Sequence, residues 1–496
     1  MKQVIVTLCP SGGRFAAPAG QSLLEALRQQ GFSLDAPCGG RGTCGKCRVP
    51  ADGREELACQ YTLTEDVTVE LPEQARVQVL EGDSAAAADG RHEYVLAFDV
   101  GTTTVVAFLS DGRTGRQLSC ASAVNPQSAY GADVIARIQY EMERGDGRME
   151  EEIRACLRRL TLEAAEAAGV PAERIGLAAL VGNTAMHHLL LGLDVSPLVK
   201  PPYMPSVREA MELPADWLPV SPEARLLVLP NIAGFVGADT VGCMVSAGFD
   251  RREELTLLID IGTNGEMVLG DRRRRIACST AAGPAFEGAK IRFGMRGAPG
   301  AIDHVSLRDG TLDCHVIGGG GAKGICGSGL LDAVYALLQG GFVDESGRMC
   351  PEVPGAWLTV ENQPAFLLRD GVYLTQKDIR EVQLAKAAIR AGIELLLDAM
   401  GRKRREVREV LLAGAFGSYL SPESACGIGM LPRSLLDRVR AIGNAAGEGA
   451  KQCALQASDY RRSIALAEAT EFLELASLPA FQDCYVDCLG FEEDEL

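Results

Sequence analysis

Apolar and polar residues alternate in two places near the start of the chain, at residues 4–8 and 67–71. A period of two is typical of a strand with one buried face, so both stretches predict strands. Between them, leucines within residues 22–30 recur at helical spacing, and Gly31 follows as a helix stop. These patterns together predict a small α+β module of the β-grasp type over residues 1–79.

The rest of the chain alternates strand-like apolar runs with helical patterns, as in an α/β protein. Two of its segments, residues 95–109 and 257–269, resemble each other. Each is an apolar run, then Asp-x-Gly-Thr, then a second apolar run. Such a duplication indicates two related lobes, which we place at about 93–250 and 251–490 of a domain spanning 93–496.

Residues 80–92 separate these two regions and are rich in Ala, Gly and Asp. This composition is typical of a flexible linker, and a coil of this length spans on the order of 20 Å root mean square. We therefore expect the N-terminal module to swing relative to the rest of the chain.

Four cysteines stand in the N-terminal module at Cys38, Cys44, Cys47 and Cys59, and glycines fill the loop that carries the first three. A tight glycine-rich turn lets backbone N–H groups point at the sulfurs of a cluster. The spacing is one residue longer in its first gap than the plant-type ferredoxin pattern. A hairpin predicted at residues 52–53 returns the chain to the fourth cysteine. A zinc site and free thiols are the alternatives, but zinc ribbons use two separated C-x2-C pairs, so the pattern favours a [2Fe–2S] cluster.

The duplicated hairpins carry candidate nucleotide ligands. Their Gly and Thr residues present N–H groups and hydroxyls to phosphate oxygens, and the Asp that ends each first strand is suited to a hydrated Mg²⁺. A third glycine-rich turn within residues 411–418 allows close approach of adenine. Hairpins with a purely structural role are the alternative. The candidates are Asp99, Gly101, Thr102, Thr103 and Thr104 in the first hairpin, Asp260, Gly262, Thr263 and Asn264 in the second, and Gly414, Ala415 and Gly417 in the third turn.

Two such hairpins followed by that turn resemble the ATPase superfamily of actin, sugar kinases and heat-shock chaperones. The resemblance implies ATP as the nucleotide. It also implies that Gln383 and Lys386, on a helix predicted to begin after Thr375, reach the ribose; a solvated helix face is the alternative. Either Asn231 or Asp239 is implied as the residue that orients the attacking water. Each of these two residues is equally compatible with capping or bracing a helix.

Composition narrows the classes of function. The net charge of −17 argues against nucleic acid as a partner. No apolar run is long enough to span a bilayer, and the N-terminus has no signal-peptide pattern. Most of the 16 cysteines are scattered singly, as expected for reduced, buried residues. We therefore expect a cytoplasmic protein that does not enter a membrane.

A ferredoxin-like module joined to this ATPase type resembles the reductive activators of corrinoid proteins. The resemblance implies ATP-dependent, one-electron reduction of Co(II) to Co(I) in a corrinoid methyl-transfer protein. It further implies an external low-potential electron donor and a homodimer formed through the ATPase domain. The stretches that carry it are residues 182–188, 230–239, 323–329, 375–381 and 443–449.

Two features depart from the family pattern. Larger relatives carry an extra domain between the ferredoxin and ATPase parts, and the gap from Cys47 to Cys59 is compact in this chain. Other functions also remain open at this point. They are a small-molecule kinase with an appended ferredoxin, an activator of a radical enzyme, and an electron carrier without enzymatic activity.

Overall fold

The computed structural model of the chain describes residues 2–9, 13–30, 32, 34, 40, 42, 45–71, 86–131 and 133–491. Cys38 and Cys44, two of the four predicted cluster ligands, lie outside these residues, as do residues 80–85 of the predicted linker. Among the helices described, none is both long and apolar enough to cross a bilayer.

The N-terminal module is a five-stranded sheet in the order β2-β1-β5-β3-β4, with helix α1 packed on it. The two strands expected from the alternation, β1 and β5, pair in parallel, and their buried faces contact the leucines of α1. Asp52 and Gly53 have φ angles of 47° and 75°, which suits the tight turn of the predicted hairpin. The elements are β1 (Gln3–Cys9), β2 (Arg14–Pro18), α1 (Leu23–Gln29), β3 (Arg48–Ala51), β4 (Arg54–Leu57) and β5 (Val67–Glu70).

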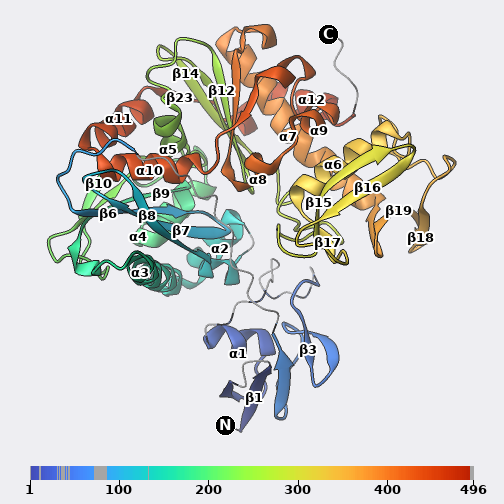
Figure 1. Ribbon diagram of the computed structural model, residues 1–496, viewed down its shortest axis with the longest axis horizontal. Coiled ribbons are helices and arrows are strands. Elements are labelled where there is room, and N and C mark those ends of the chain that lie inside the picture. Colours follow the sequence, from blue (N-terminus) through green and yellow to red (C-terminus); the bar gives the residue numbers. More distant parts are fainter. Residues whose placement is uncertain are drawn as a thin grey trace.

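The first lobe is built on a six-stranded sheet in the order β10-β11-β9-β6-β7-β8. Its central strands β6 and β7 form the first duplicated hairpin, and β9 runs parallel to β6. Helices cover both faces of this sheet (Figure 1). The elements are β6 (Tyr94–Val100), β7 (Thr104–Asp111), β8 (Gln117–Val124), η1 (Pro126–Ala129), α2 (Val134–Arg144), α3 (Arg148–Ala168), η2 (Ala172–Arg174), β9 (Ile175–Gly182), α4 (Thr184–Leu191), η3 (Ser196–Val199), β10 (Met211–Pro214), β11 (Arg225–Val228) and α5 (Ala238–Ala247).

The second lobe repeats this plan with a sheet in the order β22-β21-β12-β13-β14-β23. Here β12 and β13 form the second hairpin, and β21 runs parallel to β12 as β9 does to β6. The elements of this sheet and its helices are β12 (Thr256–Ile261), β13 (Gly265–Gly270), β14 (Arg275–Thr280), α7 (Gln376–Met400), η4 (Arg404–Glu406), β21 (Glu409–Ala413), α8 (Gly414–Tyr419), α9 (Pro422–Gly427), η5 (Arg433–Arg438), β22 (Val439–Ala441), α10 (Ala445–Leu455), α11 (Ala457–Glu468), β23 (Thr470–Phe472), η6 (Leu475–Ser477) and α12 (Pro479–Asp487).

Two three-stranded sheets are inserted between β14 and α7 and lie to one side of the second lobe (Figure 1). One has the order β16-β15-β17 and packs on α6, and the other has the order β18-β19-β20. Their elements are β15 (Ala301–Arg308), β16 (Thr311–Val316), β17 (Gly324–Ile325), α6 (Gly327–Gln339), β18 (Trp357–Val360), β19 (Gln363–Arg369) and β20 (Val372–Thr375).

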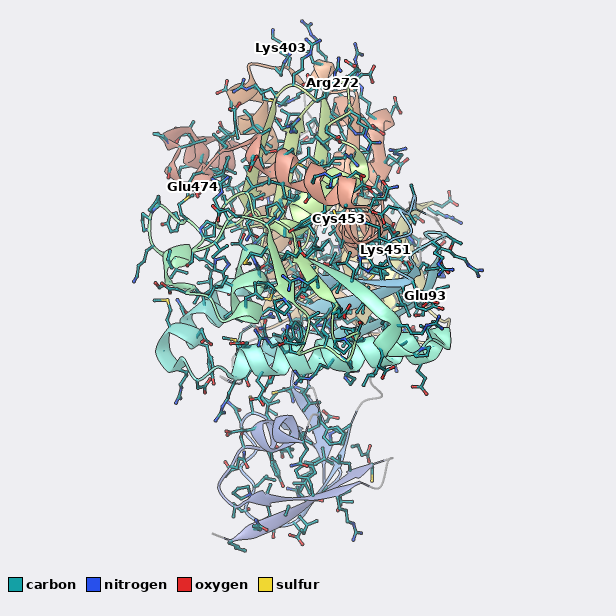
Figure 2. All side chains as sticks on the ribbon, turned by 90° about the vertical axis from the view of Figure 1, so that its left-hand side faces the viewer. Glu93, Arg272, Lys403, Lys451, Cys453 and Glu474 are labelled. Carbon is teal, nitrogen blue, oxygen red and sulfur yellow. The ribbon has the colours of Figure 1, made fainter. Side chains whose placement is uncertain are left out.

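A shared hydrophobic cluster joins the two lobes. Helices α5 and α10 pack on each other, and the cluster contains side chains from the sheets of both lobes. Lys451 on α10, labelled in Figure 2, donates a hydrogen bond to Gln117 on β8 at 2.7 Å, and its ammonium lies 5.2 Å from the ring centroid of Phe108. Helix α10, which belongs to the second half of the chain, therefore packs on the first lobe.

The described part of the predicted linker, residues 86–92, lies against the ATPase lobes. The Asp89 N–H donates to the carbonyl of Leu455 at 3.0 Å, and its carboxylate accepts from the N–H of Ala457 at 3.1 Å. For these residues the structure differs from the flexible coil expected over 80–92. The partners of Asp89 are backbone groups at the junction of α10 and α11. The composition of residues 80–92, which is polar and rich in small residues, does not indicate such contacts.

Candidate nucleotide site and cluster loop

The two duplicated hairpins meet at a single carboxylate. Thr103 Oγ1 donates to Glu287 Oε2 at 2.9 Å, and Thr263 Oγ1 donates to Glu287 Oε1 at 2.6 Å. Each hairpin turn is also closed in the same way. The Gly101 N–H donates to the carbonyl of Thr104 at 2.9 Å, and the Gly262 N–H to that of Asn264 at 2.9 Å. The structure therefore brings together the two hairpins that the sequence predicts to grip a phosphate chain.

A buried arginine supports the first hairpin. Arg137 on α2 donates through Nη2 to the carbonyl of Thr102 at 2.6 Å. Asn183 donates to the hydroxyl of the same threonine at 2.8 Å. Burial lowers the pKa of Arg137 to about 10, partly offset by the nearby charge of Glu287. A buried cation beside these hydroxyls suits the binding of phosphate.

Three predicted acids lie close together below the hairpins: Asp99 at the end of β6, Asp239 at the start of α5 and Asp260 at the end of β12. Burial raises the pKa of all three. Together with repulsion from Asp260, burial brings the pKa to about 6 for Asp99 and about 7 for Asp239. Asn444 opposes the shift at Asp99 by donating to its Oδ2 at 2.8 Å.

A divalent cation suits this group of acids because its charge offsets their repulsion. The described residues contain no group of three His, Cys, Asp or Glu side chains that are placed to hold one ion together. The fit is therefore to hydrated Mg²⁺, which keeps several waters and is bound by one or two carboxylates and by phosphate oxygens.

The third glycine-rich turn lies directly beside Asp260. Gly414 follows β21 with φ of 84°, and a Cβ built on it would lie 2.6 Å from Asp260 Oδ1. Ala415 and Gly417 continue α8 from this point. Phe416 stacks on Phe286 with ring centroids 4.9 Å apart. All three predicted nucleotide motifs thus adjoin one another.

Asn231 is placed differently. Its buried side-chain amide lies 2.5 Å from His187 Nδ1 and donates to the carbonyl of Val207 at 3.3 Å. Burial lowers the pKa of His187 to about 3, so the imidazole that faces Asn231 is neutral. These contacts hold Asn231 against His187 on α4 and against the backbone at Val207, and a role of Asn231 in orienting water stays a prediction. Of the two residues proposed for the attacking water, only Asp239 lies with the other acids.

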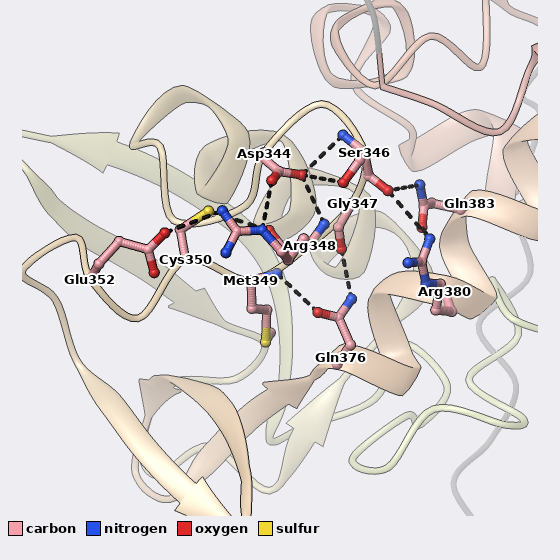
Figure 3. A network of polar contacts seen from close by, with 10 residues as sticks. All are labelled: Asp344, Ser346, Gly347, Arg348, Met349, Cys350, Glu352, Gln376, Arg380 and Gln383. Atoms are coloured by element: carbon pink, nitrogen blue, oxygen red, sulfur yellow. Dashed lines mark hydrogen bonds and ion pairs between the residues drawn. The ribbon is translucent and has the colours of Figure 1, made fainter.

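Gln383 and Lys386 on α7 hold neighbouring backbone. Gln383 Nε2 donates to the carbonyls of Ser346 at 3.0 Å and Leu489 at 2.9 Å, and Lys386 Nζ donates to that of Gly490. Figure 3 shows Gln383 beside Ser346 and Arg380 in a polar network. The structure does not bring these two side chains to the hairpins. Their contact with a ribose stays a prediction, and it requires that they exchange these partners.

The described glycines of the cysteine loop have the backbone conformation expected of a tight turn. Gly40, Gly42 and Gly45 have φ of 87°, 76° and 68°, a left-handed conformation that favours glycine. A Cβ on Gly40 would lie 3.8 Å from Cβ of Cys59, so the loop does return to the fourth cysteine. The side chain of Cys47 is buried. Thiolate donors beside glycines of this conformation fit a [2Fe–2S] cluster.

Four site residues were missed from the sequence: Glu287, Asn444, Arg137 and Asn183. Asn183 caps α4 and lies within the family stretch 182–188. Asn444 caps α10 and lies within the family stretch 443–449, so its position carried a signal. The sequence carried no such signal for Glu287 or Arg137. Glu287 stands in an irregular glycine-rich segment, and Arg137 has the pattern of a solvated helix face.

A separate cavity of about 700 Å³ lies between β15, β16 and α6, with His304, His315 and Asp332 in its wall. It contains none of the predicted site residues. The nucleotide candidates and this cavity are therefore distinct features of the second half of the chain.

Three family models match the chain. They are described as a 2Fe-2S iron-sulfur cluster binding domain, over residues 6–67, the RACo middle region, over 94–252, and the C-terminal domain of RACo, the ASKHA domain, over 254–496.

Known proteins are similar over most of the chain. The corrinoid activation enzyme RamQ of Eubacterium limosum is 35% identical, covering 79% of this chain and 69% of RamQ. The [Co(II) methylated amine-specific corrinoid protein] reductase of Methanosarcina barkeri is 27% identical, covering 80% of this chain and 77% of that protein. A solved structure of a reductive activator for corrinoid, iron-sulfur protein is 27% identical with a TM-score of 0.73, covering 98% of both chains.

Proposed function

Because the chain belongs to the family of reductive activators of corrinoid proteins, we propose that it is an ATP-dependent reductase of a corrinoid protein. It restores the active carrier by reducing Co(II) to Co(I) with one electron. The observation that carries this proposal is the meeting of the two duplicated hairpins at Glu287, beside the buried acids and the third glycine turn. This ATPase site stands in the same chain as a ferredoxin-like cysteine loop.

The residues of the site have different roles in binding the nucleotide and hydrolysing it. The hairpin N–H groups and the hydroxyls of Thr103 and Thr263 bind the phosphate chain. Asp99 and Asp260 hold hydrated Mg²⁺. Asp239 orients the attacking water, and its pKa of about 7 suits a group that accepts a proton near neutral pH. Gly414 leaves room for the nucleotide beside Asp260.

A [2Fe–2S] cluster bound by Cys38, Cys44, Cys47 and Cys59 supplies one-electron transfer at low potential. Moving an electron uphill costs about 2.3 kcal/mol per 100 mV. ATP contributes to such a step only when nucleotide binds two arrangements of the chain with different affinity. The duplicated lobes, each carrying one hairpin, are the elements whose arrangement nucleotide changes.

Finer features of the function rest on the same resemblance. We propose domain limits of 1–79, 80–92 and 93–496, an external low-potential electron donor, and a homodimer formed through the ATPase domain. We also propose a cytoplasmic location, because cysteines such as Cys278 and Cys453 are buried core residues rather than disulfide partners.

The decisive experiment follows Co(I) absorbance after the reduced protein is mixed anaerobically with a Co(II) corrinoid protein, with and without Mg-ATP. We expect ATP-dependent Co(I) formation that falls about 100-fold in Asp260→Asn and is lost in Cys47→Ser. Asp313→Asn, at an exposed carboxylate, and Cys9→Ser, at a cysteine outside the loop, are matched controls and should retain it. Equal Co(I) formation without ATP, or in Asp260→Asn, would contradict the proposal.

A further inference from the structure

One loop contacts both hairpins and the third glycine-rich turn. Residues 283–295, here called the 283–295 loop, lie within the connection between β14 and β15. Glu287 in this loop accepts hydrogen bonds from Thr103 of the first hairpin and Thr263 of the second. The preceding Phe286 stacks on Phe416 of the third turn with an interplanar angle of 10°. The loop is thus in contact with all three nucleotide motifs.

The far end of the same loop holds the cysteine loop of the N-terminal module. Lys46, between Cys44 and Cys47, donates through Nζ to the carbonyls of Ile291 at 3.2 Å and Gly294 at 2.8 Å. Charge-assisted hydrogen bonds of this kind are stronger than neutral ones. Figure 1 shows the N-terminal module directly below the lobes, on the side where β17 lies. Lys46, which precedes the predicted cluster ligand Cys47, therefore docks its end of the cysteine loop on the ATPase domain.

The middle and the far end of the 283–295 loop pack on each other. A Cβ added to Gly294 would lie 2.1 Å from the carbonyl oxygen of Gly288, which is the residue after Glu287. The Gly294 N–H donates to the carbonyl of Ile291 at 3.1 Å, and the Met295 N–H donates to the carbonyl of Ile325, on β17, at 2.9 Å. Because these backbones touch with no side chain between them, a shift at Glu287 is passed directly to the carbonyls that hold Lys46.

Nucleotide and Glu287 compete for the same hydrogen bonds. The hydroxyls of Thr103 and Thr263 carry one proton each, and both are donated to Glu287. A phosphate that accepts these two hydrogen bonds leaves the carboxylate without its donors and places negative charge beside it, so Glu287 is pushed away.

We propose that the 283–295 loop is a latch that makes nucleotide binding and docking of the cluster loop oppose each other. Phosphate displaces Glu287, the loop shifts, and Lys46 loses the carbonyls of Ile291 and Gly294. The cysteine loop is thereby released for contact with the corrinoid partner. This inference rests on the proposed function and names the residues through which ATP acts on the electron-transfer module.

Coupling between two binding events is reciprocal, so the latch is testable without any turnover. In the full-length protein with its cluster, Lys46→Met removes the dock, and we expect a non-hydrolysable ATP analogue with Mg²⁺ to bind about 5-fold or more tightly. Lys2→Met is the matched control, because Lys2 donates within its own module to Thr64. Its nucleotide affinity should equal that of the unmodified chain.

A double-mutant cycle tests the route through Glu287. Glu287→Gln removes the charge that phosphate must displace, so we expect tighter nucleotide binding and no further gain from adding Lys46→Met. Glu361→Gln is the control, since Glu361 pairs with Arg292 of the same loop but contacts neither threonine. In the unmodified chain, nucleotide should also raise amide hydrogen exchange at residues 288–295.

Unchanged or weaker nucleotide binding in Lys46→Met, or additive effects of the two substitutions, would overturn the latch. The Co(II) reduction assay then decides the function separately. Retained ATP-dependent reduction with no coupling would reject this inference alone. Failure of the unmodified chain to bind nucleotide would reject the proposed function and the latch together.

Discussion

Buried carboxylates determine how the nucleotide site responds to pH. Burial, with repulsion from Asp260, raises the pKa of Asp239 to about 7 and that of Asp99 to about 6. In the unfolded chain both groups ionise near 4. The folded chain therefore binds more protons between about pH 4 and pH 7, and this contribution to stability falls as the pH rises through that window.

At this scale we expect Asp239→Asn to raise the thermal midpoint at pH 8, because it removes a carboxylate whose burial and repulsion from Asp260 outweigh the hydrogen bond that it accepts from the Thr240 N–H. The difference from the unmodified chain should shrink as the pH falls through this window, and it should level off below about pH 4, where Asp239 becomes protonated in the unfolded chain as well. Calorimetric scans at several pH values measure this, with Asp313→Asn as an exposed control. A difference that stays constant with pH would show that Asp239 is not the titrating group.

At the scale of elements, the site depends on turns that only glycine adopts without strain. Gly414 leads from β21 into α8 with φ of 84°, and a Cβ there would meet Asp260 at 2.6 Å. Gly401, which ends α7, has a similar φ of 63° but open space around its Cα. Substituting Gly414 and Gly401 in turn therefore separates the effect of backbone strain from the effect of contact with Asp260.

We accordingly expect Gly414→Ala and Gly401→Ala each to lose about 1–2 kcal/mol of stability from the left-handed backbone. Gly414→Ala alone should also weaken nucleotide binding, by at least 10-fold, because its methyl group displaces the Asp260 carboxylate. Denaturant titration and nucleotide titration together provide the comparison. Equal nucleotide affinity in the two variants would mean that the third turn is not part of the site.

At the scale of the whole molecule, the stretch before β6 joins the first lobe to the end of α10. Asp89 accepts from the N–H of Ala457, at the start of α11, and donates to Leu455. This contact resembles a helix cap supplied from elsewhere in the chain, and caps contribute about 0.5–2 kcal/mol.

Asp89→Ala should therefore destabilise the protein by about 1 kcal/mol and raise amide exchange at the start of α11. Asp111→Ala offers a comparison, because Asp111 accepts from the N–H groups of Arg113 and Thr114 within its own turn. Exchange at α11 that is no faster in Asp89→Ala than in Asp111→Ala would show that residues 86–92 do not hold the helix.

The sequence by itself determined the elements and the chemistry that repeats locally. Alternation at residues 4–8 and 67–71 predicted β1 and β5, and the two Asp-x-Gly-Thr hairpins predicted two lobes with a nucleotide between them. These features are readable because strand period, glycine turns and short motifs are properties of neighbouring residues.

Only the tertiary structure decided which distant groups meet. Glu287 lies 184 residues from Thr103, and Lys46 lies 245 residues from Ile291, so no local pattern relates them. Asn231 and Gln383 had suitable side chains for the site. In the packed structure, however, Asn231 contacts His187, and Gln383 donates to the carbonyls of Ser346 and Leu489. A side chain's chemistry is set by its residue type, whereas its partners are set by how the sheets and helices pack.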